Sequence, residues 1–204
     1  MIVRDALWGS TNPYEGAKPD EALEGWGFDN PIFDRLIEEV KPALIVEVGS
    51  WVGASAIHMA LACDAEVVCI DTWLGWPDCW STEQGRKKLR LERGYPGVYH
   101  QFASNVVAWE CEDQITPMPM TSRQGFAWMK EHDVHPDLVY IDGSHQFADV
   151  AADIMDAYDS GARLIFGHDY NSEQNPGVRE AVEECLWKWS RVEDAGEFWV
   201  WRRE

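Results

Sequence analysis

The sequence predicts an α/β fold with a doubly wound, mostly parallel sheet and one antiparallel hairpin strand near its C-terminal end. Two observations support this prediction. Short apolar runs of strand length alternate along the chain with longer segments whose apolar residues recur at helical spacing, which is typical of strand-helix-strand units. The final part of the chain differs, because two short strand-like runs flank a turn at Ala195-Gly196 and are expected to pair as a hairpin.

Five runs are expected to form the parallel strands, because each is short, mainly apolar and bounded by turn-forming or charged residues. They are residues 43–48, 66–71, 115–118, 137–142 and 162–169. The first run lies between Pro42 and Gly49 and suits a strand that is buried on both faces. The prolines in and after the third run favour an edge or a strand end.

Helices are expected between these strands. The first begins at Asp29-Asn30-Pro31, where a capping residue precedes a proline in the first turn, and it ends at Lys41-Pro42. The next follows Gly53, and the others cover residues 99–110, 124–132, 147–158 and 176–189. Residues 147–158 and 176–189 carry the apolar stripe that a sheet-covering helix needs.

The chain is expected to form one domain, since 204 residues with 46% hydrophobic content can bury one substantial core. Residues 1–28 are rich in Gly, Pro, Asn and Glu and are expected to form an irregular N-terminal arm, which leaves 29–204 as the domain. Within the domain, residues 73–114 are the least regular part and are rich in Trp and Tyr. A long aromatic connection of this kind is typical of a lid or binding loop.

The composition argues against several classes of partner. The chain has 36 acidic and 17 basic residues, whereas binding to nucleic acid needs clustered Lys and Arg. The basic cluster at 86–93 is interpreted either as a solvated helix face or as a contact to an anionic group of a substrate. Without a long apolar run or a signal peptide, we expect a cytoplasmic protein with no membrane partner. The five scattered cysteines indicate neither a disulfide framework nor a zinc ribbon.

A glycine-containing turn joins the first predicted strand to the next helix. Gly49 and Gly53 allow a tight backbone turn and leave room for a ligand beside the free N–H groups of the helix. The spacing is not Gly-x-Gly-x-x-Gly and no Gly-Lys-Ser/Thr loop is present, so neither NAD nor ATP is favoured. Asp71 ends the second strand, where a carboxylate can accept hydrogen bonds from ribose hydroxyls. Together these elements predict a ribose-bearing ligand.

Acidic and histidine side chains stand at the ends of the fourth and fifth predicted strands. Asp142 and His145 follow one strand, and His168 and Asp169 end the other. If the two strands are parallel neighbours, these four side chains converge at the sheet edge where open α/β folds place ligands and catalytic groups. This pattern predicts a metal site with a neighbouring base.

Several motifs along the chain share their order with one enzyme family. They are Ile45-Val-Glu-Val-Gly49 with Gly53-Ala-Ser55, Ile70-Asp-Thr-Trp73, Phe102-Ala-Ser-Asn105, Asp137-Leu-Val-Tyr-Ile-Asp-Gly-Ser-His145, and Gly167-His-Asp-Tyr170 with Gly177-Val-Arg-Glu-Ala-Val182. Together they resemble the class I S-adenosylmethionine-dependent methyltransferases, most closely the branch with macrolide and other natural-product sugar O-methyltransferases. The resemblance covers about residues 30–202 and implies a Rossmann-like fold.

The resemblance also implies roles for individual residues. The glycine turn would contact the methionine portion of S-adenosylmethionine, Asp71 would hold the ribose, and the end of the third strand would lie near adenine. The residues implied in cofactor binding are Glu47, Gly49, Ser50, Trp51, Gly53, Ser55, Asp71, Thr72, Trp73, Thr121, Ser122 and Asp142. In metal-dependent members, the positions of Asp142 and Asp169 hold a magnesium ion. His168 stands where a second acidic residue is more common.

Methyl transfer from a sulfonium needs an aligned acceptor oxygen and removal of its proton. A divalent cation on Asp142 and Asp169 would lower the pKa of a sugar hydroxyl, and His145 would take the proton near neutral pH. His168 has three interpretations: a metal ligand, a residue that orients Asp169, or a hydrogen-bonding residue of the loop. As a ligand it would favour Mn²⁺ or another nitrogen-tolerant ion over Mg²⁺.

We therefore expect a metal-assisted O-methyltransferase that acts on a sugar, a glycan or a sugar-bearing small molecule. The alternative is a catalytically silent accessory protein with a cofactor-binding fold. Trp73, Trp76 and Trp80 follow Asp71 and are expected to stack on adenine or a sugar ring. The remaining aromatic cluster, near the C-terminal end, is expected to pack in the core or in a homo-oligomer: Trp187, Trp189, Trp199 and Trp201.

Overall fold

The computed structural model describes residues 2–25, 27–186 and 192–203. Its centre is a seven-stranded sheet with the order β3-β2-β1-β4-β5-β7-β6. The strands are β1 (Leu44–Val48), β2 (Glu66–Asp71), β3 (Ile115–Pro119), β4 (Leu138–Ile141), β5 (Leu164–Gly167), β6 (Glu193–Ala195) and β7 (Phe198–Arg202). Strands β1 to β5 are parallel, whereas β7 is antiparallel to both β5 and β6. The predicted fold class is confirmed, including the antiparallel hairpin, and β3 is an edge strand as expected.

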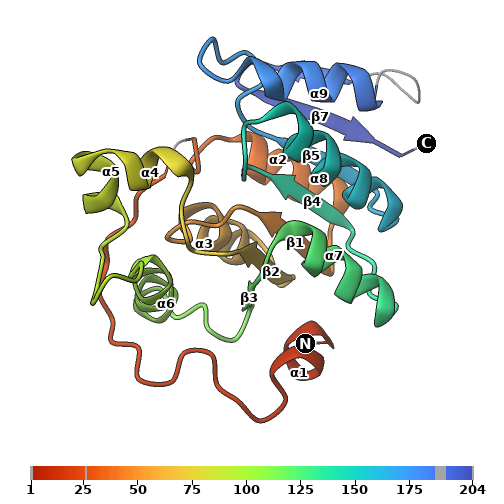
Figure 1. Cartoon of the computed structure of the whole chain (residues 1–204). Coiled ribbons are helices and arrows are strands. Elements are labelled where there is room, and N and C mark those ends of the chain that lie inside the picture. The colour runs from red at the N-terminus through yellow and green to blue at the C-terminus, as the bar shows by residue number, and fades with distance from the viewer. Residues whose placement is uncertain (1, 26, 187–191, 204) are drawn as a thin grey trace.

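Helices cover both faces of the sheet (Figure 1). In the described part of the chain they are α1 (Ile2–Trp8), α2 (Ile32–Val40), α3 (Ala54–Ala62), α4 (Pro77–Ser81), α5 (Glu83–Lys88), α6 (Val98–Ala108), α7 (Ser122–Glu131), α8 (Phe147–Asp159) and α9 (Pro176–Leu186). Alternate residues of each strand point to opposite faces of the sheet. Ile45 packs with the side chains of α2, α3 and α6, while its neighbour Val46 packs with those of α7, α8 and α9. Both faces are therefore closed by apolar packing, as parallel strands require.

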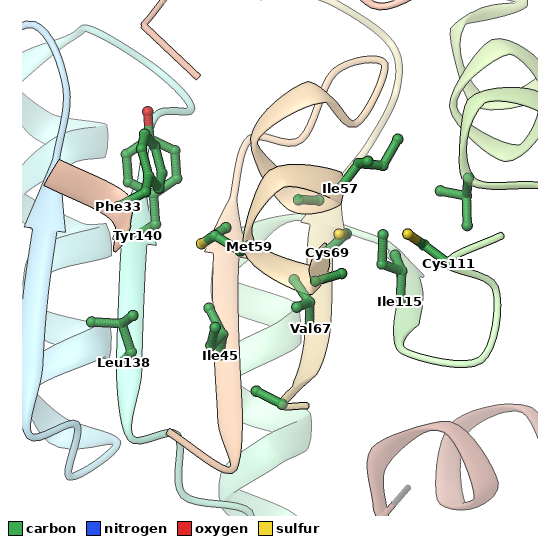
Figure 2. Packing of buried hydrophobic residues seen from close by; sticks show 14 of the residues in the cluster. Phe33, Ile45, Ile57, Met59, Val67, Cys69, Cys111, Ile115, Leu138 and Tyr140 are labelled. Carbon is green, nitrogen blue, oxygen red and sulfur yellow. The ribbon is translucent and has the colours of Figure 1, made fainter. Parts of the chain in front are cut away.

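On the face of the sheet covered by α2, core packing fixes the orientation of Tyr140 in β4. Figure 2 shows Phe33 of α2 beside Tyr140 of β4, with Leu138 and Ile45 further down the same face. The rings of Phe33 and Tyr140 are 5.0 Å apart in an edge-to-face arrangement, and Phe166 of β5 lies 4.7 Å from Tyr140. Such contacts hold the Tyr140 ring in one orientation. Its hydroxyl consequently reaches the end of β4.

The N-terminal arm is only partly irregular, which corrects one expectation. Residues Ile2–Trp8 form α1. A helix this short is not stable alone, but Val3 is buried against the sheet, and this packing stabilises the helix. The arm then runs beside the edge of the sheet, where Trp8 donates to the carbonyl of Pro117 and Tyr14 to that of Ile115. The arm therefore shields β3, which would otherwise be an open edge.

The insert at 73–114 contains three helices, α4, α5 and α6. Five of the eight exposed large hydrophobic residues of the described chain lie within it before α6: Leu74, Trp76, Trp80, Leu91 and Tyr95. Near the other end of the chain, Trp199 and Trp201 are buried in the core, as expected. Trp187 and Trp189 lie outside the described residues. Across the described ranges, no helix combines the length and the apolar character needed to cross a bilayer.

Candidate active site

The carboxyl ends of β1, β2, β4 and β5 lie at one edge of the sheet. Strands β2 and β3 continue on one side of β1, and β4 and β5 continue on the other. In doubly wound sheets the ligand lies outside this point of divergence. The turns that follow these four strands therefore form the candidate active site.

Gly49 allows the ends of β1 and β4 to approach each other closely. Its φ of 88° is left-handed, and a Cβ atom there would overlap the backbone of Asp142 and Gly143. Only glycine tolerates both conditions. The turn ends at Gly53, which also has a φ of 88° and directly precedes α3. The two glycines thus place the N-terminus of α3, with its unpaired N–H groups, beside the end of β4.

Asp71 at the end of β2 holds the glycine turn through backbone hydrogen bonds. Its Oδ2 accepts from the N–H groups of Ser50, at 3.0 Å, and Trp51, at 2.8 Å. Its Oδ1 accepts from the N–H of Trp73 at 2.7 Å. Burial raises the pKa of the Asp71 carboxyl, and these N–H groups oppose that shift. Both lone pairs of Oδ2 are used in this way, but Oδ1 accepts only from Trp73 among these groups, so Asp71 can fix the turn and still accept one ligand hydroxyl through Oδ1.

Glu47 near the end of β1 is a fully buried acid with one unused oxygen. Its Oε1 accepts from the hydroxyl of Ser55 at 2.5 Å, but no described residue bonds to Oε2 or to the buried hydroxyl of Ser50. Burial raises the pKa of Glu47 to about 7, and the hydrogen bond from Ser55 opposes that shift. Buried polar atoms without partners are uncommon and point to a missing ligand or water.

Four titratable side chains meet at the ends of β4 and β5. Nε2 of His145 lies 3.0 Å from Oδ2 of Asp169 and 4.0 Å from Oδ1 of Asp142. Nδ1 of His168 lies 3.6 Å from the same oxygen of Asp169 and 3.9 Å from that of Asp142. The two predicted strand-end clusters therefore form one group, whose members come from adjacent parallel strands.

The charges in this cluster stabilise one another. The two carboxylates raise the pKa of His145 to about 9, against the opposing effect of burial. Burial opposes the charge on His168, but Asp169 and Asp142 outweigh it and raise the pKa of this imidazole. Burial also opposes ionisation of Asp169, yet the two histidines hold its pKa well below the usual range. In this arrangement protons on the histidines neutralise the carboxylates, a role that a cation can take over.

Backbone and core contacts orient the two carboxylates. The hydroxyl of Tyr140 donates to Oδ2 of Asp142 at 2.9 Å. Asp169 has a φ of 61°, a left-handed conformation that Asp tolerates better than most residues. The next residue, Tyr170, donates its N–H to the carbonyl of Glu197 in the β6–β7 turn at 2.9 Å. The hairpin thus fixes the loop that carries Asp169.

The family model described as a methyltransferase domain matches residues 46–170, which include the glycine turn, Asp71 and all four residues of the cluster. The chain belongs to this methyltransferase family. No curated protein sequence matches the chain significantly.

Solved structures share the fold of this methyltransferase at low sequence identity. The O-methyltransferase from Bacillus cereus in complex with SAH has a TM-score of 0.60 and 16% identity, over 98% of this chain and 95% of that one. TomG from Streptomyces achromogenes, an O-methyltransferase of tomaymycin synthesis in complex with SAM, has a TM-score of 0.60 and 16% identity, over 95% and 90%. CalS11, a TDP-rhamnose 3'-O-methyltransferase of calicheamicin biosynthesis, has a TM-score of 0.62 and 17% identity, over 84% and 77%.

Thr121 and Ser122 lie at the start of α7 in this methyltransferase: Thr121 is the N-cap residue, and Ser122 is the first residue of the helix. The Thr121 hydroxyl accepts from the N–H of Gln124, and the Gln124 side chain accepts from the N–H of Thr121, which forms a capping box. Ser122 bonds to the buried carboxyl of Asp153, whose pKa burial raises to about 6. Both predicted cofactor residues thus stand at the end of β3 with a structural role of their own.

The expectation that Trp73 stacks on adenine or a sugar ring is wrong. The Trp73 ring is only 2% exposed, and its indole N–H donates to the carbonyl of Trp51 at 2.6 Å. A ring packed in the core against Tyr99 and Phe102 cannot stack on adenine or a sugar. Trp76 is 43% exposed and lies 5.4 Å from the Trp51 ring, so it keeps a free surface beside the glycine turn.

Three residues that contact the site have no role predicted from the sequence, although one of them, Tyr140, stands within a quoted motif. Tyr140 precedes Asp142 by two positions, and the two-residue period of a strand could have placed both on one face. Glu197 lies 3.9 Å from Nε2 of His168 but belongs to the distant hairpin turn. Gly27 lies so close to His168 that an added Cβ would be 3.3 Å from Nε2. No pattern in the sequence near Glu197 or Gly27 predicts that these residues lie beside His168.

Proposed function

We propose that this methyltransferase transfers a methyl group from S-adenosylmethionine to a hydroxyl oxygen of a sugar or sugar-bearing small molecule, assisted by a divalent cation. The observation that carries the proposal is the single cluster of Asp142, His145, His168 and Asp169 beside the glycine turn. It offers anionic oxygens and an imidazole at the sheet edge where the family fold places its ligand.

The glycine turn fits the donor. The unused Oε2 of Glu47 and the unused hydroxyl of Ser50 are buried polar atoms, suited to the ammonium and carboxylate of the methionine portion. Asp71 is joined to the same turn by two hydrogen bonds to its Oδ2, and its Oδ1 keeps a lone pair for a ribose hydroxyl. The SAH and SAM complexes among the structural neighbours support this assignment.

The cluster also fits a cation. One potential ligand atom each from Asp142, His168 and Asp169 lies within 4.8 Å of the others, so small rotations would bring all three around one ion. Two carboxylates suit Mg²⁺, whereas the imidazole of His168 extends the choice to Mn²⁺. When bound, the cation would lower the pKa of the acceptor hydroxyl.

The protein side chains then divide the remaining tasks. Tyr140 holds Asp142 through its hydroxyl, and the β6–β7 hairpin holds the Asp169 loop. His145 lies 40% exposed at the outer side of the cluster and is placed to take the acceptor proton. A cation on the carboxylates would weaken their hold on the His145 proton and leave the imidazole free to act as a base.

The test is methyl transfer from labelled S-adenosylmethionine to a panel of sugars and glycosides, with and without EDTA. We expect transfer that EDTA abolishes and that Mg²⁺ or Mn²⁺ restores. Full activity under EDTA would contradict the role of the cation. Binding of S-adenosylhomocysteine without transfer to any acceptor would instead favour the accessory-protein alternative.

A further inference from the structure

A buried polar network lies behind the glycine turn, away from the strand-end cluster. Its centre is Asn105 of α6, which is 0% exposed. Its Nδ2 donates to the carbonyl of Val52 at 2.8 Å and to that of Ala22 at 3.3 Å. Its Oδ1 accepts from the N–H of Ala22 at 2.8 Å and from Gln101 at 3.0 Å. Both donors and both acceptor sites of the amide are therefore used.

Residues 20–25 of the N-terminal arm, here called the strap, are fixed to α6 by this network. Gln101 donates to the carbonyl of Asp20 at 2.9 Å, next to the two bonds between Asn105 and Ala22. Arg90 of the insert donates to Gln101 at 2.8 Å and lies 3.3 Å from Glu24. The strap is thus joined to α6, to the insert and, through Asn105, to the carbonyl of Val52 in the glycine turn.

The strap leads across the candidate active site. A Cβ on Gly25 would be 3.2 Å from the Cβ of Ala54, the first residue of α3. Beyond the strap, Gly27 stands against Nε2 of His168. In Figure 1 the segment rises from α1 past α6 towards α2. The arm therefore passes from the start of α3, beside the glycine turn, to the strand-end cluster.

We infer that Asn105 is a positioning residue that couples the strap to the glycine turn, so that cofactor binding and closure of the strap favour each other. The inference rests on the proposed function for the identity of the cofactor. Its physical basis is that one side chain bonds simultaneously to Val52 in the turn and to Ala22 in the strap. A ligand that orders the turn thereby lowers the cost of ordering the strap, and the reverse holds equally.

The first experiment needs no ligand and measures amide hydrogen exchange in the wild type and in Asn105→Ala. We expect the variant to exchange about tenfold faster both in the strap and in residues 50–53, because the strap loses two hydrogen bonds and the turn loses one to the same side chain. The matched control is Gln114→Ala. Gln114 also bridges distant backbone, with bonds to the carbonyls of Ala60 and Cys63. It should leave exchange in the strap unchanged, and unaltered exchange in Asn105→Ala would overturn the inference.

The second experiment adds S-adenosylhomocysteine and uses calorimetry with hydrogen exchange. In the wild type the ligand should slow exchange in the strap. Asn105→Ala should lose that response and bind about tenfold more weakly, the weakening expected if the coupling is worth about one or two net hydrogen bonds. Gln114→Ala should bind as the wild type does. Ala22→Pro, which removes the strap N–H without touching α6 or the turn, should also abolish the response.

The outcomes separate this inference from the proposed function. If S-adenosylhomocysteine binds the wild type but does not affect the strap, or binds Asn105→Ala equally well, the coupling is wrong and the proposed cofactor stands. If the wild type binds no S-adenosylhomocysteine, the proposed cofactor is wrong and its coupling to the strap falls with it.

Discussion

The two halves of the candidate active site are built differently. At the ends of β1 and β2, Asp71 accepts three backbone N–H groups and the turn geometry depends on glycine. At the ends of β4 and β5, the contacts are between charged side chains separated by 3.0 to 4.0 Å. Backbone hydrogen bonds preserve their geometry over a wide pH range, whereas ion pairs depend on protonation and on bound cations. The first half is thus suited to hold a ligand, and the second to move protons.

The largest effect should come from the charged half. Asp169→Asn removes the carboxylate that contacts both His145 and His168. We expect kcat to fall by about a hundredfold or more, the usual effect of losing an acid-base or metal contact, while binding of S-adenosylhomocysteine changes little. Asp149→Asn is the matched control, because the Asp149 carboxylate accepts a hydrogen bond from the hydroxyl of Ser144 in the loop before α8. Comparable losses in both variants would contradict the proposed role.

Disrupting the backbone-held half should affect binding and stability together. Asp71→Ala leaves three N–H groups without their acceptor and should lower the free energy of unfolding by about 1–3 kcal/mol. It should also weaken S-adenosylhomocysteine binding, as measured by calorimetry. Asp137→Ala is the control, since Asp137 accepts from the N–H groups of Ala43 and Leu44 at the opposite end of β1. We expect a similar loss of stability with unchanged binding; weakened binding in both would mean that Asp71 acts only through stability.

Glu47 should make ligand binding at the ends of β1 and β2 depend on pH. Its raised pKa of about 7 means that the folded protein favours the protonated acid, so this group's ionisation costs stability as the pH rises from about 4.5 through 7. The ligand ammonium needs the ionised form, so binding of S-adenosylhomocysteine should tighten by about tenfold between pH 6 and 8. Calorimetry should detect proton release on binding at pH 6. In Glu47→Gln the pH dependence should disappear, and its persistence would assign it to another group.

The smallest effect should come from the insert. Trp76→Ala removes an exposed ring that contacts Trp51 beside the glycine turn. We expect the KM for the acceptor to rise by about three- to tenfold, the range expected for one lost aromatic contact, with kcat and cofactor binding unchanged. Trp109→Ala, at the end of α6 and also partly exposed, is the control. An equal rise in both variants would remove Trp76 from acceptor recognition.

Much of this arrangement could be predicted because it depends on local pattern. Strand ends are marked by the change from apolar to charged residues, so Asp71, Asp142, His168 and Asp169 could be placed at one sheet edge once the strands were known to be parallel. Gly49 could be recognised as a turn residue, but not as the residue that meets the Asp142 backbone. The helix α1 could not be predicted with equal ease, because its stability comes from packing against β3 rather than from its own short sequence.

Apolar periodicity and turn residues act over a few neighbours, so the order and type of the main elements and the positions where chemistry could occur follow from the amino-acid order alone. The partners of those residues depend on the packed fold. Asp71 is held by backbone N–H groups some 20 positions away, and Asn105 bonds to Val52 and Ala22, which lie 53 and 83 positions away from it. Trp73 proved to be a core residue for the same reason. Contacts between distant segments depend on how all helices and strands pack together, and no short stretch of sequence encodes them.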